Sequence, residues 1–288
     1  MRQFVAERMP DDNGVILVRG KSFHHLHDVL RVKEGFMVHA RLPDGSLQQM
    51  TVAAVDPAGK NMTLSVAGER SSVRAKEIPE LWLFQFAARP PKMELILRQA
   101  VECGVSHFIP VAGAFCQGGS VESARKRARE CALKEGRWQS IITEAMEQSG
   151  SAGAISVHEC MTVREMCDLW KGARHPPVTG ESAVAVHDAR FALALYERSE
   201  GTCTVSEAAA RLKEQMASCK DKGGAHVAGA VAVGAEGGIE SAELRLLQSA
   251  GFIPVHFSTN ILRCETAALY GVAAAQTVQE ELLCQSKE

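Results

Sequence analysis

The chain has 288 residues, a formal net charge of −2, 46% hydrophobic residues and 23% charged residues. These values are typical of a folded globular protein and exclude an intrinsically disordered chain, which combines few apolar residues with high net charge. The sequence has no run of eighteen apolar residues and no apolar segment like that of a signal peptide, so we expect a cytoplasmic protein without a membrane span. Nine cysteines without a Cys-x-x-Cys pair indicate reduced thiols and no zinc site.

Residues 1–75 contain short apolar runs separated by turn signals, which predict a small β-rich domain. A helix is predicted from an N-cap at Ser22 through Arg31, because Phe23, Leu26 and Leu30 share one face. The predicted strands cover residues 14–18, 36–40, 50–55 and 62–66.

After a polar linker at residues 69–79, strands and helices alternate, which predicts βαβ units on a parallel sheet in a second domain, residues 79–288. The polar segment 198–224 is interpreted as a peripheral insertion with a helix from Ser206 to Cys219. The predicted strands are 80–86, 107–111, 182–186 and 227–233, and the predicted helices are 91–103, a continuous stretch over 120–149, and 262–284.

Two segments near the C-terminus each pass from an apolar strand through a loop of small residues to a helix. They are Val231–Glu240 and Phe257–Ala267. Free backbone N–H groups in such loops can bind a polar ligand, so the two loops predict one composite pocket. The glycines match neither the Gly-x-Gly-x-x-Gly pattern nor the phosphate-binding Gly-x-x-x-x-Gly-Lys pattern, which argues against an ordinary nucleotide site.

Both loops resemble signatures of the bacterial 16S ribosomal RNA (uracil-N3) methyltransferases, which belong to the SPOUT superfamily of knotted enzymes. The first loop resembles Gly-Pro-Glu-Gly-Gly, and the second resembles Leu-Gly-x-x-Ile-Leu-Arg-x-Glu-Thr-Ala. Further blocks resemble the family in order along the chain: His25-Leu26, Val29-Leu30-Arg31, Gly35, Lys92-Met93-Glu94, Val101-Glu102-Cys103-Gly104-Val105, Arg137-Trp138, Ile141, Glu144-Ala145 and Glu147-Gln148-Ser149-Gly150.

The resemblance implies an α/β fold in which a PUA-like β-barrel that binds RNA (1–75) precedes a SPOUT methyltransferase domain with a trefoil knot (79–288). It implies S-adenosyl-L-methionine as cofactor, 16S rRNA in the 30S subunit as partner, and methylation of uridine N3. It also implies a homodimer with each active site near the dimer interface. Neither a membrane nor a metal ion is expected, and His24, His25 and His27 point in different directions on the predicted helix without a completing ligand set.

The expected cofactor site combines glycines that allow close approach with apolar walls for an adenine ring. Its residues are Val233, Gly234, Glu236, Gly237 and Gly238 in the first loop, and Phe257, Ser258, Asn260, Ile261 and Leu262 in the second. Arg263 and Glu265 are the candidate catalytic residues: Arg263 for a phosphate or a uracil oxygen, Glu265 for deprotonation at N3 or for holding Arg263. The candidate RNA-binding residues are His25, Arg31 and Lys92.

Several usually basic family positions are not basic in this chain, namely Gln99, Ser151 and Asn260, and the loop 112–117 lacks the family's Ser-Glu-Arg character. Two alternatives therefore stay open: an RNA-binding protein of the same fold with little catalysis, and a methyltransferase for another RNA site. The basic residues of segment 125–137 are interleaved with glutamates, which favours a solvated helix face over an RNA patch.

Overall fold

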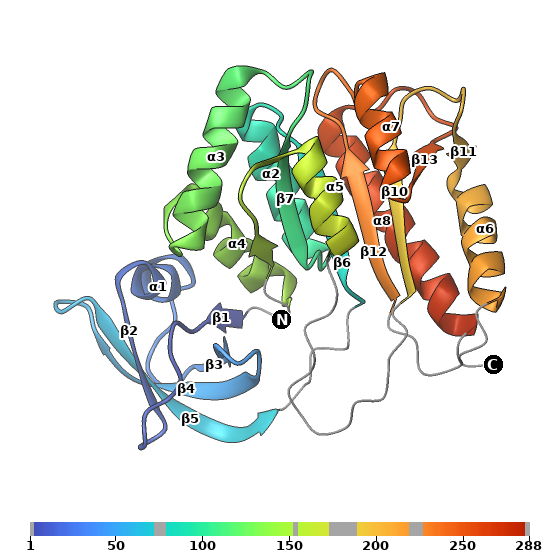
Figure 1. Cartoon of the computed structure of the whole chain (residues 1–288). Coiled ribbons are helices and arrows are strands. Elements are labelled where there is room, and N and C mark those ends of the chain that lie inside the picture. Colours follow the sequence, from blue (N-terminus) through green and yellow to red (C-terminus); the bar gives the residue numbers. More distant parts are fainter. Residues whose placement is uncertain (1–2, 72–78, 152–154, 173–188, 219–226, 286–288) are drawn as a thin grey trace. The chain divides into compact units, whose positions relative to one another are not determined.

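The computed structural model describes residues 3–71, 79–151, 155–172, 189–218 and 227–285. The chain divides into two compact units (Figure 1). The first unit contains residues 1–78 and 143–154, and the second contains residues 79–142 and 155–288.

The described part of the first unit is built on a five-stranded sheet. Its order is β1-β3-β4-β5-β2, with β1 parallel to β3 and the other neighbours antiparallel. Alternate residues of the strands face a core that includes Ile16, Met50 and Leu64. The strand bounds are β1 (Gln3–Val5), β2 (Val15–Arg19), β3 (Met37–Arg41), β4 (Leu47–Asp56) and β5 (Asn61–Ser71). The four predicted strands overlap β2 to β5, whereas β1 was not predicted.

The helix of this unit differs at both ends from the prediction of Ser22 to Arg31. Helix α1 (Gly20–His24) starts directly after β2 because Gly20 has a positive φ of 62°, and α1 continues into the π-helical turn η1 (His25–Val29). Arg31 has a φ of 53°, which ends the helical conformation. The predicted N-cap at Ser22 is therefore wrong, since that residue lies inside α1.

The second unit has a sheet in which every described strand pairing is parallel, which confirms the predicted α/β class with a parallel sheet. The order is β11-β13-β10-β12-β6-β7-β8, and β9 pairs with β7. All seven residues of β12 are buried, as expected for a central strand covered on both faces. The bounds are β6 (Leu81–Phe86), β7 (His107–Ala112), β8 (Ser156–Val157), β9 (Met161–Thr162), β10 (Ala189–Leu195), β11 (Cys203–Thr204), β12 (Val227–Val233) and β13 (Phe252–His256).

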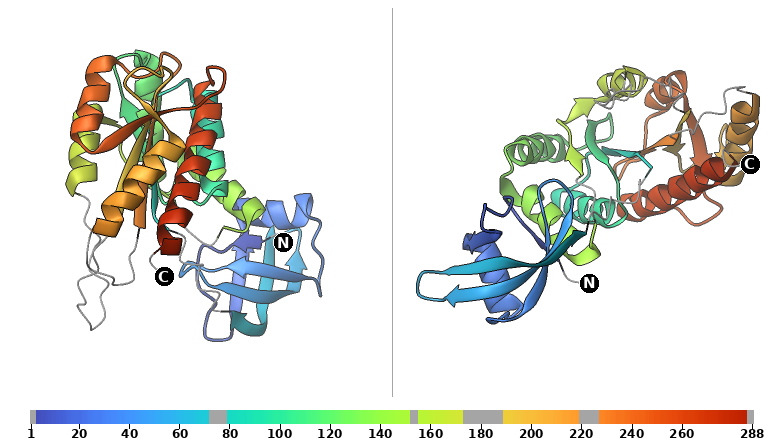
Figure 2. Two further views of the ribbon diagram at one scale, coloured as in Figure 1. Left: turned by 90° about the vertical axis from the view of Figure 1, so that its right-hand side faces the viewer. Right: turned by 90° about the horizontal axis from the view of Figure 1, so that it is seen from below.

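Helices cover both faces of this sheet. Helices α2 and α8 pack together on one face, with α6 beside α8, while α5 and α7 pack together on the other face (Figure 2). The bounds are α2 (Pro90–Glu102), α3 (Gly118–Ala132), α4 (Gly136–Ser149), α5 (Val163–Gly172), α6 (Val205–Ser218), α7 (Ser241–Ser249) and α8 (Cys264–Gln285). No helix within the described ranges is both long and apolar enough to cross a membrane.

The continuous helix predicted over 120–149 is wrong, because the chain forms two helices there. Lys134 has a φ of 59°, and Gly136, the first residue of α4, has a φ of 79°; two left-handed residues so close together cannot continue a right-handed helix. The first helix therefore ends at Ala132 and the second starts at Gly136.

The segment from 182 to 224 also differs from its prediction. The strand predicted at 182–186 lies outside the described residues, and the described strand β10 (189–195) was not predicted. Within the segment 198–224, Cys203 and Thr204 pair with β13 and form the edge strand β11 of the sheet. Helix α6 is capped by Thr204 rather than Ser206, since the Glu207 carboxylate accepts the Thr204 N–H at 2.7 Å.

Gly271 allows α8 to lie close to the centre of the sheet. A Cβ at this position would lie 2.6 Å from Leu195 Cδ1 and 2.9 Å from Val231 Cγ1. We predict that Gly271→Ala destabilises the protein by about 1–3 kcal/mol through overpacking, although alanine favours helix over glycine by about 1 kcal/mol. Gly119→Ala in α3 is the matched control, because a Cβ there meets nothing within 4 Å. Urea unfolding measures both variants, and equal stability of the two would contradict this packing.

Candidate active site

The carboxyl ends of β10, β12 and β13 surround a cavity of about 400 Å³. The strand register brings these ends together, because Leu195 pairs with both Val233 and Val255. The two motif loops and the end of β10, which are separated in sequence, therefore line the same cavity. The cavity is lined by Lys92, Leu195, Tyr196, Glu197, Val233, Gly234, Ala235, Glu236, Gly237, Gly238, Phe257, Thr259, Asn260, Ile261, Leu262, Arg263, Cys264 and Ala267.

The first loop is a tight turn that requires glycine. A Cβ on Gly234 would lie 2.6 Å from the carbonyl carbon of Gly238, and Gly238 itself has a φ of 78°. The Gly238 N–H donates to the Ala235 carbonyl at 3.0 Å, which closes the turn. The glycines of the turn thus line the cavity with backbone alone.

The second loop supplies apolar side chains and polar backbone to the same cavity. Phe257 makes an edge contact with Tyr270 of α8, with ring centroids 5.5 Å apart, and Leu262 is half-buried. Ile261 is 83% exposed although it lines the cavity, so it is an uncovered apolar side chain at the rim. Ser258 is the one predicted cofactor residue that is not among the lining residues, whereas its neighbours Thr259 and Asn260 are.

The third side of the cavity was not predicted. Leu195, Tyr196 and Glu197 close it at the end of β10, and Glu197 reaches the glycine turn, since its Oε2 lies 3.0 Å from where a Gly238 Cβ would be. These residues were not predicted, because the sequence does not show that β10 lies between the two motif strands β12 and β13.

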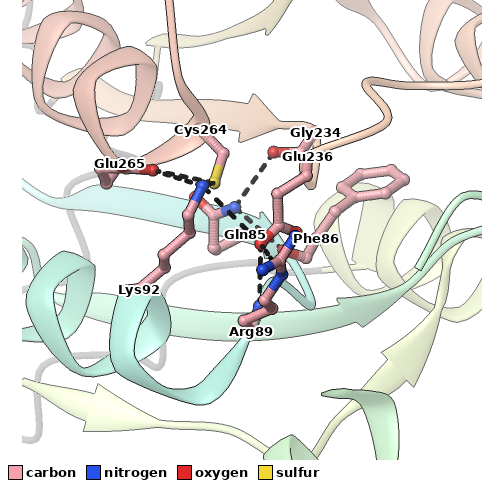
Figure 3. Close-up of polar contacts among 8 residues, drawn as sticks. All are labelled: Gln85, Phe86, Arg89, Lys92, Gly234, Glu236, Cys264 and Glu265. Atoms are coloured by element: carbon pink, nitrogen blue, oxygen red, sulfur yellow. Dashed lines mark hydrogen bonds and ion pairs between the residues drawn. The ribbon is translucent and has the colours of Figure 1, made fainter. Parts of the chain in front are cut away.

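Lys92 of α2 joins the two motif loops. Its ammonium lies 3.7 Å from Glu236 of the first loop and 3.1 Å from Glu265 at the start of α8 (Figure 3). The same nitrogen lies 3.8 Å from the Cys264 sulfur. Lys92 therefore forms ion pairs within the protein, and its predicted contact with RNA stays a prediction.

Glu236 binds the start of α2 and does not cap α7. Its carboxylate accepts the backbone N–H of Arg89 at 3.2 Å and lies 3.6 Å from the Arg89 guanidinium (Figure 3). The N-cap of α7 is instead Glu240, paired with Glu243 in a capping box. Beneath the turn, the buried Gln85 amide donates to the carbonyls of Phe86 and Gly234, at 2.9 and 3.3 Å.

Burial and the neighbouring charges shift the pKa values of Glu265, Lys92 and Cys264. Burial raises the pKa of Glu265, but its own backbone N–H and hydrogen bonds with Lys92 and Cys264 outweigh that effect and hold the pKa below its ordinary value. Burial lowers the pKa of Lys92, but the hydrogen bond to Glu265 and the nearby Cys264 and Glu236 leave the pKa above its ordinary value. Burial and the neighbouring Glu265 raise the pKa of the Cys264 thiol to about 12. At neutral pH the group is an ammonium, a carboxylate and a neutral thiol.

Arg263 lies at the mouth of the cavity with an exposed side chain. Its guanidinium makes no hydrogen bond or ion pair with the described residues, including Glu265, so the predicted support of Arg263 by Glu265 is absent from this arrangement. A cation without a partner beside an apolar cavity can bind a phosphate or a carbonyl oxygen of a ligand.

The other candidate RNA-binding residues, His25 and Arg31, belong to the first unit. The His25 imidazole lies 3.7 Å from the Glu147 carboxylate, and the Arg31 side chain is exposed. His24 and His27 both pair with Asp28. No set of three His, Cys, Asp or Glu side chains suited to a metal ion occurs in the part of the chain that the structure describes.

Three basic residues of α3 pair with glutamates on the same helix, namely Arg125, Lys126 and Arg127. Arg125 lies 3.5 Å from Glu122, and Arg127 lies 3.1 Å from Glu130. Their charge is thus partly balanced along the helix, which agrees with the predicted solvated face.

The ion pair between Lys92 and Glu265 predicts a specific dependence of stability on pH. Because the pKa of folded Glu265 is lowered, its contribution is present above the unfolded pKa of about 4.3 and is lost as the pH falls through the folded value. We expect Glu265→Gln to lower the Tm at pH 7. We also expect the Tm of this variant to decrease less on acidification than that of the unmutated protein. Lys92→Met should also lower the Tm at pH 7.

The control for this pair is Lys126→Met, because Lys126 forms an exposed pair with Glu130 at 3.9 Å and such pairs contribute about 0–1 kcal/mol. Thermal unfolding between pH 3 and pH 8 measures all variants. If the Tm of Glu265→Gln falls with decreasing pH as steeply as the Tm of the unmutated protein, the assigned ion pair is contradicted.

The chain is similar over nearly its whole length to named methyltransferases. It is 23% identical over 282 residues to "Ribosomal RNA small subunit methyltransferase E 2" of Borreliella burgdorferi, covering 98% of this chain and 99% of the relative. It is 24% identical over 267 residues to "Ribosomal RNA small subunit methyltransferase E" of Bacillus subtilis, covering 92% and 91%.

The fold is similar to that of a crystal structure of ribosomal RNA small subunit methyltransferase E from Neisseria gonorrhoeae bound to S-adenosyl methionine. That comparison gives a TM-score of 0.70 at 22% identity, and it covers 96% of this chain and 98% of the other. A family model described as an RNA methyltransferase domain matches residues 76–276, which is more than half of the chain. The chain therefore belongs to the RNA methyltransferase domain family, as its motifs indicated.

Proposed function

We propose that this protein is an S-adenosyl-L-methionine-dependent methyltransferase that modifies N3 of a uridine in 16S rRNA of the small ribosomal subunit. The observation that carries the proposal is the cavity, because its two motif loops are the segments that resemble the uracil-N3 methyltransferases and they enclose a single space. The relatives from Borreliella burgdorferi and Bacillus subtilis, whose names specify small-subunit rRNA, support the substrate.

The cavity residues fit the proposed cofactor. A volume of about 400 Å³ lies within the range of about 300–1,000 Å³ typical of small-ligand sites. Leu195, Phe257 and Leu262 offer apolar surface for an adenine ring, and the glycine turn offers backbone groups at close approach. The proposed cofactor residues are Val233, Gly234, Glu236, Gly237 and Gly238 with Phe257, Ser258, Asn260, Ile261 and Leu262.

When bound, the cofactor supplies a methyl group that forms an N–C bond at uridine N3 as the C–S bond breaks and the N3 proton is lost. Arg263 stabilises the negative charge that develops on the uracil ring, because its guanidinium is exposed at the mouth of the cavity and unpaired within the described chain. Glu265 is a weak base, since its pKa is lowered and it is bound to Lys92, so it positions the loop and the proton passes to water.

The proposed RNA contacts follow from the chemistry of the target. N3 lies on the pairing edge of uracil, so the base must be unpaired and turned into the cavity. We assign residues 1–75 as a PUA-like RNA-binding domain, with His25 and Arg31 as contacts. Lys92 orders the active site, because its ammonium is held by two carboxylates, and it stays with His25 and Arg31 as a proposed RNA contact.

We further propose that residues 79–288 form the trefoil-knotted SPOUT fold and that the protein acts in the cytoplasm as a homodimer, without a metal ion. Exposed apolar side chains on α2 and α8 support a dimer face. Leu95 is 43% exposed, Leu269 37% and Tyr270 47%, and α2 and α8 pack side by side.

The direct test is transfer of labelled methyl groups to 30S subunits that lack uridine N3 methylation, followed by mass spectrometry of the nucleosides. The proposal predicts 3-methyluridine. Cofactor binding without any methylated product would support an RNA-binding protein of this fold, and methylation of a different nucleoside would support another RNA site.

Gly234→Ala should weaken cofactor binding. The added Cβ would meet the backbone of Gly238, and overpacking of about 1–3 kcal/mol weakens binding about tenfold or more. Isothermal titration with S-adenosyl-L-methionine measures the Kd. Gly119→Ala, in open space on α3, is the control, and an unchanged Kd for Gly234→Ala would refute the assignment of the turn.

Arg263→Ala should lower kcat on 30S subunits about 100-fold, which is the size of effect seen when one hydrogen-bond donor to a developing anion is removed. The Kd for the cofactor should stay the same. Arg263→Lys should recover part of the loss, because it restores the charge without the planar fork. Arg164→Ala, an exposed arginine of α5, is the control. A full rate for Arg263→Ala would rule out the proposed role.

A further inference from the structure

Phe115 is an exposed aromatic side chain in the loop between β7 and α3, and its side chain is 52% exposed. This loop is also a place where the sequence departs from the Ser-Glu-Arg character of the family it resembles. The family pattern therefore gives Phe115 no role, and its position in this chain needs its own explanation. The inference drawn below rests on the proposed function.

Phe115 packs directly on the glycine turn of the cavity. A Cβ added to Gly237 would lie 2.8 Å from the Phe115 Cβ and 3.4 Å from its Cγ. Gly237 lines the cavity and Phe115 does not. The phenyl group therefore lies next to the cavity, outside the space assigned to the cofactor and the target base.

The loop that carries Phe115 is held in place by buried groups. The backbone N–H of Ala114 donates to the Glu243 carboxylate at 2.7 Å, and Glu243 is only 8% exposed. The same carboxylate group accepts the Glu240 N–H at 3.1 Å. On the other side, a Cβ at Gly113 would lie 2.4 Å from the Phe86 ring, so the loop backbone lies against that ring. Phe115 is thus presented on an ordered backbone.

A single exposed apolar residue is ordinary on a protein surface and is not a site by itself. Phe115 differs because it combines an aromatic face, an ordered loop and direct contact with the active-site turn. Aromatic side chains stack on unpaired bases with little sequence preference, and a target uridine turned out of its stack leaves neighbouring bases unpaired. We propose that Phe115 is a stacking subsite for the unpaired base that flanks the target uridine.

The test compares Phe115→Ala, Phe115→Leu and Phe115→Trp, with Leu133→Ala as control because Leu133 is 73% exposed at the far end of α3. Leucine keeps apolar packing on Gly237 but lacks an aromatic face, whereas tryptophan keeps that face. The readouts are KM and kcat for 30S subunits and the Kd for S-adenosyl-L-methionine. We expect the alanine and leucine variants to raise KM about tenfold, with kcat and the cofactor Kd nearly unchanged, and the tryptophan variant to behave like the unmutated protein.

An unchanged KM for Phe115→Ala would overturn the proposal. So would full activity of Phe115→Leu, or a loss explained by weaker cofactor binding, because either result would mean that Phe115 only packs on the turn. If the unmutated protein transfers no methyl group, the proposed function fails separately. The same variants are then compared by equilibrium binding to 30S subunits with S-adenosylhomocysteine. Weaker binding of the alanine and leucine variants supports the subsite, and equal binding overturns it.

Discussion

The ion pairs of Lys92 are the interaction on which the candidate site depends. One ammonium on α2 holds Glu236 of the first motif loop and Glu265 of the second. The loops belong to different strands and are joined at the cavity by this cation and by the strand register. Without the ammonium, Glu265 and Cys264 would lose their cationic neighbour, and Glu236 would keep only Arg89 as a cationic partner. Lys92 is thus the charge that links the two loops which the strand register brings together.

This arrangement explains a division of roles among charged residues that look alike in the sequence. Lys92, Glu236, Glu265 and Arg89 are partners of one another, and their charges are largely balanced within the protein. Arg263 has no such partner among the described residues and remains available to a ligand. The five residues do not differ in their motif context, since four lie in motif blocks and Arg89 is the N-cap residue of α2. The difference therefore lies in the geometry of their side chains.

The sequence was sufficient to predict features that depend on local pattern. The buried strand at 227–233 was predicted at its observed bounds, since seven small apolar residues suit a central parallel strand. The glycine turn was predicted from its composition. The break at Lys134 was not, because a left-handed lysine leaves no signal in an amphipathic pattern that continues on both sides.

Features that depend on tertiary pairing were predicted less well. Glu197 and Tyr196 were missed because their place at the cavity follows from the pairing of β10 with both β12 and β13, and no local pattern encodes that pairing. The ion pairs of Lys92 were not predicted either, because no local pattern links this lysine to Glu236 or Glu265. Its two carboxylate partners are 144 and 173 residues away in sequence, by subtraction of the residue numbers (236 − 92 and 265 − 92).

The central claim is that the two motif loops form one cofactor site coupled through Lys92. Hydrogen exchange of the full chain with and without S-adenosyl-L-methionine tests it most directly. We predict that the cofactor protects residues 234–238 and 258–263 together in the unmutated protein, and that Lys92→Met reduces protection in both segments. Protection of only one loop, or protection of both that does not change in Lys92→Met, would contradict it.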